Sequence, residues 1–148
     1  MGNILSIIIS IAIFISELKI KNHIDSSPKQ TKELCNGHII ITKLHNKGIM
    51  MGKLSSRQKE LKILLCAVML LSYAVYIPIL LKKGYLFVKL GFGMFLGGAW
   101  SNFYDHFFRG YVVDYIKIPH GFIKKIVFNA ADFFIAAGAI ITSVFSFF

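Results

Sequence analysis

The stretch Ile63–Leu81 constrains this chain more than any other, because it is 19 consecutive residues without a charged side chain. Runs of this length and polarity are typical of helices that span a membrane, whose apolar core takes about 20 helical residues to cross. Three further apolar segments lie at about residues 4–21, 86–101 and 127–147. With 55% hydrophobic residues in 148, the sequence predicts a mainly α membrane protein. We expect one integral-membrane domain, residues 1–148, with four transmembrane helices.

The connections between these segments differ in character. Lys82-Lys83-Gly84 reads as a tight turn between two spans. Residues 22–62 are polar and basic, and contain the β-prone run His38–Thr42 and the turn-like Asn46-Lys47-Gly48. We expect a small extracytoplasmic β-element there. The segment at 86–101 carries several glycines, and small residues of this kind let helices approach closely in lipid.

Two isolated carboxylates in apolar surroundings are the candidate catalytic groups. Asp132 is the only charge in the last apolar segment, and Asp114 lies 18 residues earlier. A charge inside a membrane span costs roughly 2.5–3.5 kcal/mol on insertion scales, so a functional role is the default hypothesis. Two acids sharing one site do not both ionise easily, and one protonated and one ionised carboxyl can hydrolyse a peptide bond by acid–base catalysis. A structural alternative is that Asp132 caps a helix or makes an interhelical contact.

Other chemistries find little support in the residue pattern. No Ser–His or Cys–His arrangement lies near the polar cluster at about residues 101–126. Cys35 and Cys66 are far apart in the sequence, which favours two free thiols. The five histidines show no ligand spacing, so we expect no metal and no cofactor. The net charge is +10, and the basic residues that carry it border hydrophobic segments. This position favours contact with anionic lipid head groups over nucleic acid. Asn129 and Asp132, three residues apart, are expected to share one helix face.

Two long motifs and two shorter ones resemble those of a known family. Residues 97–115 read GGAWSNFYDHFFRGYVVDY and residues 128–132 read FNAAD. They resemble GGAxGNxxDRxxxGxVVDF and FNxAD of lipoprotein signal peptidase (signal peptidase II). Upstream, residues 17–21 (ELKIK) look like the family's DQxxK, and residues 45–52 (HNKGIMMG) look like its HNxGAAFG loop. The resemblance covers nearly the whole chain.

The resemblance implies a fold and an activity. The fold is four transmembrane helices, a small extracytoplasmic β-cradle and a short interfacial helix. The activity is that of a metal-free aspartic endopeptidase in the bacterial plasma membrane, with its active site toward the extracytoplasmic face. It removes the signal peptide from prolipoproteins, cutting before the diacylglyceryl-modified cysteine. We therefore expect lipidated prolipoproteins and membrane lipids as partners, and a monomer.

The resemblance also assigns residues. Asp114 and Asp132 would be the catalytic dyad. Eight residues would support the dyad or hold the substrate: Asn102, Asp105, His106, Asn129, Asn46, Gly48, Glu17 and Lys21. The side-chain amides of Asn102 and Asn129 suit this role, because each carries donors and an acceptor that can fix a carboxylate.

Several positions depart from the family pattern. His106 stands in place of Arg, Ser101 in place of Gly, and Glu17-Leu18 in place of Asp-Gln, while Ile49-Met50 replaces two alanines. These departures favour a divergent member or paralogue. They also motivate an alternative, a catalytically impaired relative that binds lipidated peptides or a membrane partner. A small membrane structural protein or pore is a third interpretation, which leaves the ordered pair of aspartate motifs unexplained.

Charge and family disagree on orientation. The segments Glu17–Lys62 and Ser101–Ile126 together hold 14 of the 17 Lys and Arg residues. The positive-inside rule would make these segments cytoplasmic, whereas the resemblance places them outside. We follow the resemblance.

Overall fold

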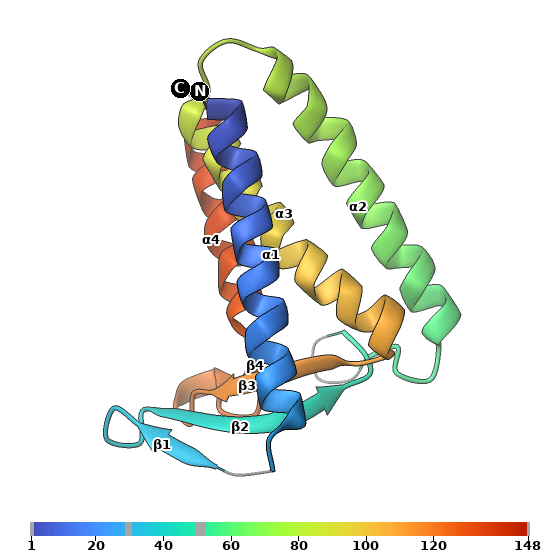
Figure 1. The fold of residues 1–148 in the computed structure, drawn as a ribbon, viewed down its shortest axis with the longest axis vertical. Helices are drawn as coiled ribbons and strands as arrows, with labels where there is room; N and C mark the ends of the chain where they lie inside the picture. The colour runs from blue at the N-terminus through green and yellow to red at the C-terminus, as the bar shows by residue number, and fades with distance from the viewer. Residues whose placement is uncertain (1, 29–30, 50–52, 148) are drawn as a thin grey trace.

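The computed structural model describes residues 2–28, 31–49 and 53–147. In these residues four α-helices stand over a four-stranded sheet (Figure 1). The helices are α1 (Gly2–Ser26), α2 (Gln58–Leu81), α3 (Leu86–Tyr104) and α4 (Ala130–Phe145). The strands are β1 (Lys32–Leu34), β2 (Ile39–Asn46), β3 (Val112–Lys117) and β4 (Val127–Phe128), antiparallel and in the order β1-β2-β3-β4. Both chain ends lie at the end of the bundle opposite the sheet (Figure 1).

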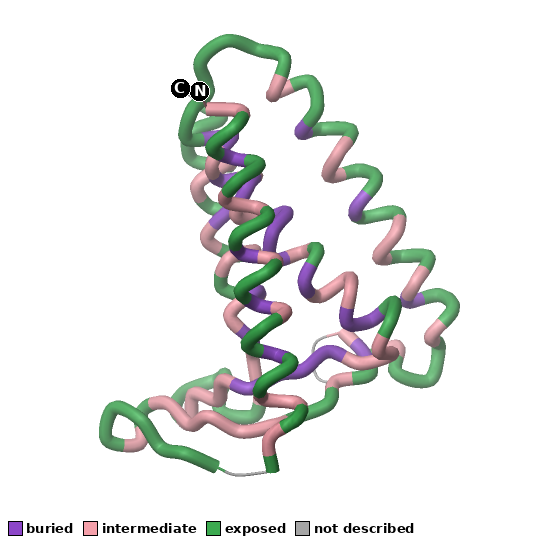
Figure 2. Tube along the Cα trace, viewed as in Figure 1, coloured by how far each residue is buried: buried purple, intermediate pink, exposed green. Residues whose placement is uncertain are grey.

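Glycines on α3 set the packing of the bundle, as the sequence predicted. A Cβ atom added at Gly98 would lie 2.5 Å from the backbone oxygen of Ala131 on α4, closer than real Cβ atoms come. On the other side of α3, a Cβ at Gly93 would meet the backbone of Ser6 on α1. Without side chains at these points the helices touch backbone to backbone. Figure 2 shows the buried residues along this contact.

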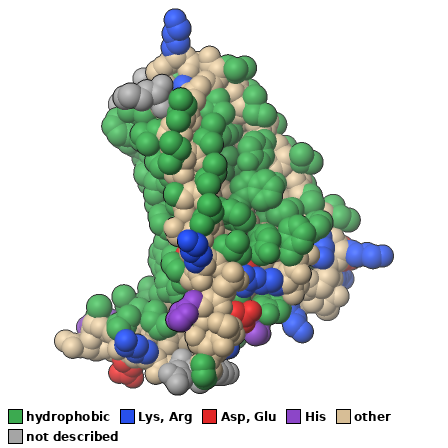
Figure 3. Space-filling model, in the orientation of Figure 1, with side chains coloured by type: hydrophobic (Ala, Val, Ile, Leu, Met, Phe, Trp, Pro, Cys, Tyr) green, Lys and Arg blue, Asp and Glu red, His purple; other side chains and the backbone are tan. Residues whose placement is uncertain are grey.

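Helix α2 stands apart from the other three and leaves most of its surface exposed (Figures 1 and 2). Its contacts include a hydrogen bond of 2.6 Å between the hydroxyls of Tyr76 and Ser6, and one of 2.8 Å from the Trp100 indole to the Tyr73 hydroxyl. By length and composition, α1 and α2 could each cross a membrane. On the face shown in Figure 3, hydrophobic side chains cover the helices, and charged ones gather mainly toward the sheet end.

The predicted boundaries of the last apolar segment were wrong at its start. Val127 and Phe128 pair with β3 as strand β4, and α4 begins only at Ala130. Asn129 is extended and caps the helix. The spacing had suggested that Asn129 and Asp132 share one helix face. Because Asn129 lies before the helix as its cap, the two residues do not share a helix face. The tertiary pairing with β3 draws these residues into the sheet, although their composition suits a span.

The sheet is also wider than predicted. Residues 22–62 supply only β1 and β2, because α1 continues to Ser26 and α2 begins at Gln58. Strands β3 and β4 come from residues 112–128. Besides the four α-helices, the described residues hold two short helical segments, a π-helical one, Asp105–Arg109, directly after α3, and a 3₁₀ turn, Gly121–Ile123. That either is the predicted short interfacial helix stays a prediction.

Candidate active site

The two predicted catalytic carboxylates lie at the junction of the sheet and the bundle, and Asn129 binds both. Asp114 lies on β3, and Asp132 lies in the first turn of α4. The Asn129 side-chain amide donates to Asp114 Oδ1 at 2.7 Å, and its backbone N–H donates to Asp132 Oδ2 at 3.0 Å. Residues 18 apart in sequence thus have their carboxylates within hydrogen-bond distance of a single residue.

The local rules of helix initiation explain this arrangement. Asn129 is the N-cap of α4, and its Oδ1 accepts from the Asp132 backbone N–H at 3.1 Å. Asp132, three residues on, returns a bond by accepting from the Asn129 backbone N–H, which completes a capping box. Because Oδ1 is used by the cap, the amide nitrogen of Asn129 is directed to Asp114. The structural alternative for Asp132, a helix cap, is therefore confirmed, while its catalytic role stays a prediction, and the cap and the carboxylate pair are one arrangement.

A second amide holds the other oxygen of Asp114. Asn46, the last residue of β2, donates from Nδ2 to Asp114 Oδ2 at 3.1 Å. The backbone N–H of Gly48 donates to Asn46 Oδ1 at 3.1 Å and fixes which way this amide faces. The predicted loop motif thus reaches the dyad through Asn46 and Gly48. Its last three residues, Met50, Met51 and Gly52, lie outside the described residues.

Burial changes the acidity of Asp114. Its side chain is 3% exposed, and loss of solvent raises its pKa to about 6. The hydrogen bonds from Asn129 and Asn46 and the charge of Lys21 lower the pKa, and the charge of Asp132 raises it. Desolvation is the largest of these effects, because a charge is poorly stabilised away from water. Asp114 therefore holds its proton at a pH where an ordinary aspartic acid has lost it.

A chain of buried and half-buried polar groups supports Asp132. Asn102 on α3 donates from Nδ2 to Asp132 Oδ1 at 2.8 Å, and its Oδ1 accepts from Lys21 Nζ on α1 at 2.8 Å. Lys21 Nζ also lies 3.1 Å from Asp105 Oδ2, and the side chains of this ion pair are fully buried. Arg109 Nε lies 3.1 Å from the other Asp105 oxygen. A buried lysine charge thus fixes the Asn102 amide, which presents its N–H groups to the carboxylate.

Glu17 binds at the start of α4. Its Oε2 accepts from the Ala131 backbone N–H at 3.1 Å, and its Oε1 accepts from the Tyr115 hydroxyl at 2.9 Å. The same hydroxyl accepts from the Ala130 backbone N–H at 3.2 Å. Sequence reasoning missed Tyr115. The available signal was its place directly after Asp114, where the motif it resembles has Phe.

His106 makes no contact of this kind. It is buried, its Nδ1 has no hydrogen-bond partner, and desolvation lowers its pKa. Among the predicted supporting residues, Asn46, Asn102 and Asn129 hydrogen-bond Asp114 or Asp132 directly. Gly48 and Lys21 bind these amides, Asp105 binds Lys21, and Glu17 binds the start of α4. Among the described residues, the structure gives His106 no hydrogen bond to either carboxylate. The guanidinium that reaches Asp105 comes from Arg109, one helical turn later, which sequence reasoning also missed. Within the described ranges, no three His, Cys, Asp or Glu residues form a group that could hold a metal ion.

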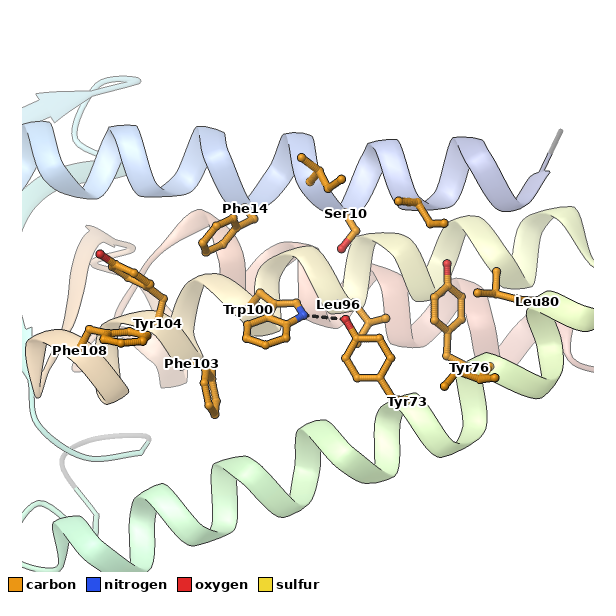
Figure 4. A pocket seen from close by; sticks show the side chains of 13 residues that line it. Ser10, Phe14, Tyr73, Tyr76, Leu80, Leu96, Trp100, Phe103, Tyr104 and Phe108 are labelled. Atoms are coloured by element: carbon orange, nitrogen blue, oxygen red, sulfur yellow. Dashed lines mark hydrogen bonds between the residues drawn. The ribbon is translucent and has the colours of Figure 1, made fainter.

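An apolar groove of about 480 Å³ runs between α1, α2 and α3 (Figure 4). Its walls include Phe14, Tyr73, Trp100 and Phe108, with the Trp100–Tyr73 hydrogen bond across it. Phe108 belongs to the π-helical segment that also supplies Asp105. The groove therefore extends along the bundle toward the end that carries the carboxylates.

The family model described as signal peptidase (SPase) II matches residues 8–148. The chain belongs to the signal peptidase II family. Lipoprotein signal peptidase of Francisella tularensis subsp. novicida is 33% identical over 104 residues, which cover 68% of this chain and 65% of that protein, just under two thirds of its length. The protein of the same name from Nostoc punctiforme is 35% identical over 120 residues, covering 80% of this chain and 72% of the relative.

Two solved structures of bacterial membrane enzymes share the fold. One superposes with a TM-score of 0.79 at 24% identity, covering 95% of this chain and 85% of the other. The second superposes with a TM-score of 0.76 at 23% identity, covering 95% of this chain and 90% of the other. The family and the helical fold with its small antiparallel sheet, both expected from the motifs, are confirmed.

Replacing Lys21 tests the buried support of the signal peptidase II site. Lys21→Met removes the partner of Asn102 and one of the two cations at Asp105. Breaking a buried ion pair on one side costs about 3–5 kcal/mol, and because Arg109 remains, we expect roughly 3 kcal/mol of destabilisation. Thermal unfolding in detergent measures it. Lys19→Met, at an exposed position of the same helix, is the control, and equal stability of the two variants would contradict the prediction.

Proposed function

We propose that this chain is a membrane-embedded aspartic endopeptidase that removes the signal peptide from diacylglyceryl-modified prolipoproteins, cutting before the lipidated cysteine. The observation that carries the proposal is Asn129, which holds both carboxylates at the buried start of α4. Membership of the signal peptidase II family and the name of the relatives, lipoprotein signal peptidase, support the substrate class.

In the proposed reaction the two acids have different roles. Asp132 lies at the positive end of the α4 dipole and accepts N–H groups on both oxygens, so it serves as the ionised base. It takes a proton from a water molecule as the water oxygen attacks the scissile carbonyl carbon. Asp114, whose raised pKa keeps it protonated below about pH 6, donates to the carbonyl oxygen. When the C–N bond breaks, the leaving amine takes the proton held by Asp132, and Asp114 takes back a proton from a hydroxyl of the tetrahedral intermediate as the C=O bond re-forms. Positioned acid–base catalysis contributes about 10²–10⁴-fold.

The surroundings suit an amphiphilic substrate. All four helices are proposed to cross the membrane, which would place the carboxylates near the boundary of lipid and water. The apolar groove beside α2 would accept the hydrophobic part of a substrate that diffuses laterally in the bilayer. We place the sheet on the extracytoplasmic face of the bacterial plasma membrane, where a lipidated precursor arrives after export.

Removing either acid tests the dyad. We expect Asp114→Asn and Asp132→Asn each to lower cleavage of a lipidated prolipopeptide in detergent by at least about 100-fold, because each removes one proton-transfer step. Product formation is followed by gel mobility or mass spectrometry. Glu33→Gln, on exposed strand β1, is the control. Unchanged cleavage in either variant would exclude the dyad. A parent that binds the peptide without cutting it would favour the catalytically impaired relative.

The pH dependence tests the role of Asp114. Because Asp114 must be protonated, kcat/KM is expected to fall as pH rises through about 6, the pKa of its carboxyl group. Asn46 donates to this carboxylate and lowers its pKa, so Asn46→Ala should raise the pKa. The descending limb of the plot of kcat/KM against pH should then move to higher pH by about 1 unit. Asn3→Ala, at the opposite end of the bundle, is the control. A limb that stays in place or moves to lower pH would contradict the assignment.

Orientation can be read from a native thiol. Cys35 is exposed in the turn between β1 and β2. In a Cys66→Ser background, a membrane-impermeant maleimide should label Cys35 in intact spheroplasts. A Cys35→Ser, Cys66→Ser, Lys83→Cys variant, with its thiol in the turn between α2 and α3, should be labelled only after lysis. The reverse pattern would show that the charge rule, rather than the family resemblance, predicts the orientation.

A further inference from the structure

The first turn of α4 is held by side chains from two other elements. The first N–H groups of a helix have no partner within the helix. Here the Ala130 N–H donates to the hydroxyl of Tyr115 on β3, at 3.2 Å. The Ala131 N–H donates to the carboxylate of Glu17 on α1, at 3.1 Å. The position of the helix start therefore depends on both partners.

These two partners are also joined to each other. The Tyr115 hydroxyl donates to Glu17 Oε1 at 2.9 Å, and the two residues are 5% and 1% exposed. One hydroxyl thus satisfies a buried carboxylate oxygen and a part-buried backbone N–H at once. Removing it leaves both groups without that partner, and buried polar groups without partners are costly.

The turn that they hold is the turn that carries the chemistry. Asn129 is the N-cap and Asp132 the third residue of α4, while Tyr115 directly follows Asp114 on β3. We propose that Glu17 and Tyr115 form a coupled positioning pair that fixes the start of α4 against β3, and thereby sets the distance between the carboxylates of Asp132 and Asp114. This inference rests on the proposed function of the dyad.

The pair also accounts for two departures from the family motifs. This chain has Glu17 where the motif it resembles has Asp, and Tyr115 where the motif has Phe. Glu17 opposite a phenylalanine would lose the donor of Oε1. An aspartate opposite Tyr115 is one methylene shorter, and could not reach both the hydroxyl and the Ala131 N–H. Each departure is therefore expected to be harmful alone and tolerated in combination.

A double-mutant cycle tests this coupling. Tyr115→Phe and Glu17→Asp are each expected to lower kcat on a lipidated prolipopeptide by about 10-fold, with KM changed by less than about 2-fold, because positioning acts on the chemical step. The variant with both substitutions is expected to lose about 10-fold, no more than either single variant and well short of the roughly 100-fold product, since residues in contact are not additive. Tyr85→Phe and Glu33→Asp, at exposed positions, are the matched controls.

Other outcomes overturn the proposal. If the double variant falls to the product of the two single losses, Glu17 and Tyr115 act independently. If Tyr115→Phe alone keeps the parental kcat, the hydroxyl positions nothing. If the parent itself does not cleave the peptide, the proposed function fails. The same cycle is then read in thermal unfolding, where additive losses overturn the pair, and a loss in the double variant no larger than that of either single variant supports it.

Discussion

A helix that begins in a buried place must find partners for its first N–H groups, and in this protein that requirement organises the polar core. Helix α4 begins where the sheet meets the bundle, and its N-cap Asn129 forms a capping box with Asp132. The cap uses one end of the Asn129 amide and directs the other to Asp114. One rule of local structure thus sets the first turn of α4 and brings two carboxylates together.

The buried charges on the bundle side of the dyad follow from the same constraint. A carboxylate at this depth needs donors, and Asn102 supplies one to Asp132 while Lys21 fixes the Asn102 amide. Lys21 is fully buried and needs an anion, which is Asp105. Buried ion pairs contribute little net stability, so this network of buried charges is better understood as orienting amide side chains than as strengthening the fold. Arg109 completes it, although the resemblance had directed attention to position 106.

The proposed catalytic residues and the apolar groove occupy different parts of the molecule. The polar network lies at the sheet end, whereas the groove beside α2 is apolar and α2 leaves most of its surface exposed. Close packing of α1, α3 and α4 through glycines makes a rigid support for the acids. Looser attachment of α2 leaves the groove between it and the bundle. A rigid reacting centre beside an apolar groove fits an enzyme whose substrate remains in the membrane.

Composition and motif order determined much in advance. The uncharged run Ile63–Leu81 indicated a membrane helix, the glycines of residues 86–101 indicated close packing, and the two aspartate motifs indicated the family and the dyad. Such features are visible because hydrophobicity, small size and isolated charge are properties of residues in sequence. Orientation in the membrane was left in conflict, because charge counting and the family resemblance point in opposite directions.

Only the tertiary structure decided how the polar residues are partnered. Val127 and Phe128 read as part of a span, yet pairing with β3 makes them a strand. Glu17 and Tyr115 are 98 residues apart and look unrelated until the fold places a hydroxyl 2.9 Å from a carboxylate. His106 stands within the motif but without a hydrogen bond from its Nδ1, while Arg109 binds Asp105. Spacing along a chain fixes which residues share an element. The partner of a buried polar group depends on which elements pack together, and that is a property of the folded molecule.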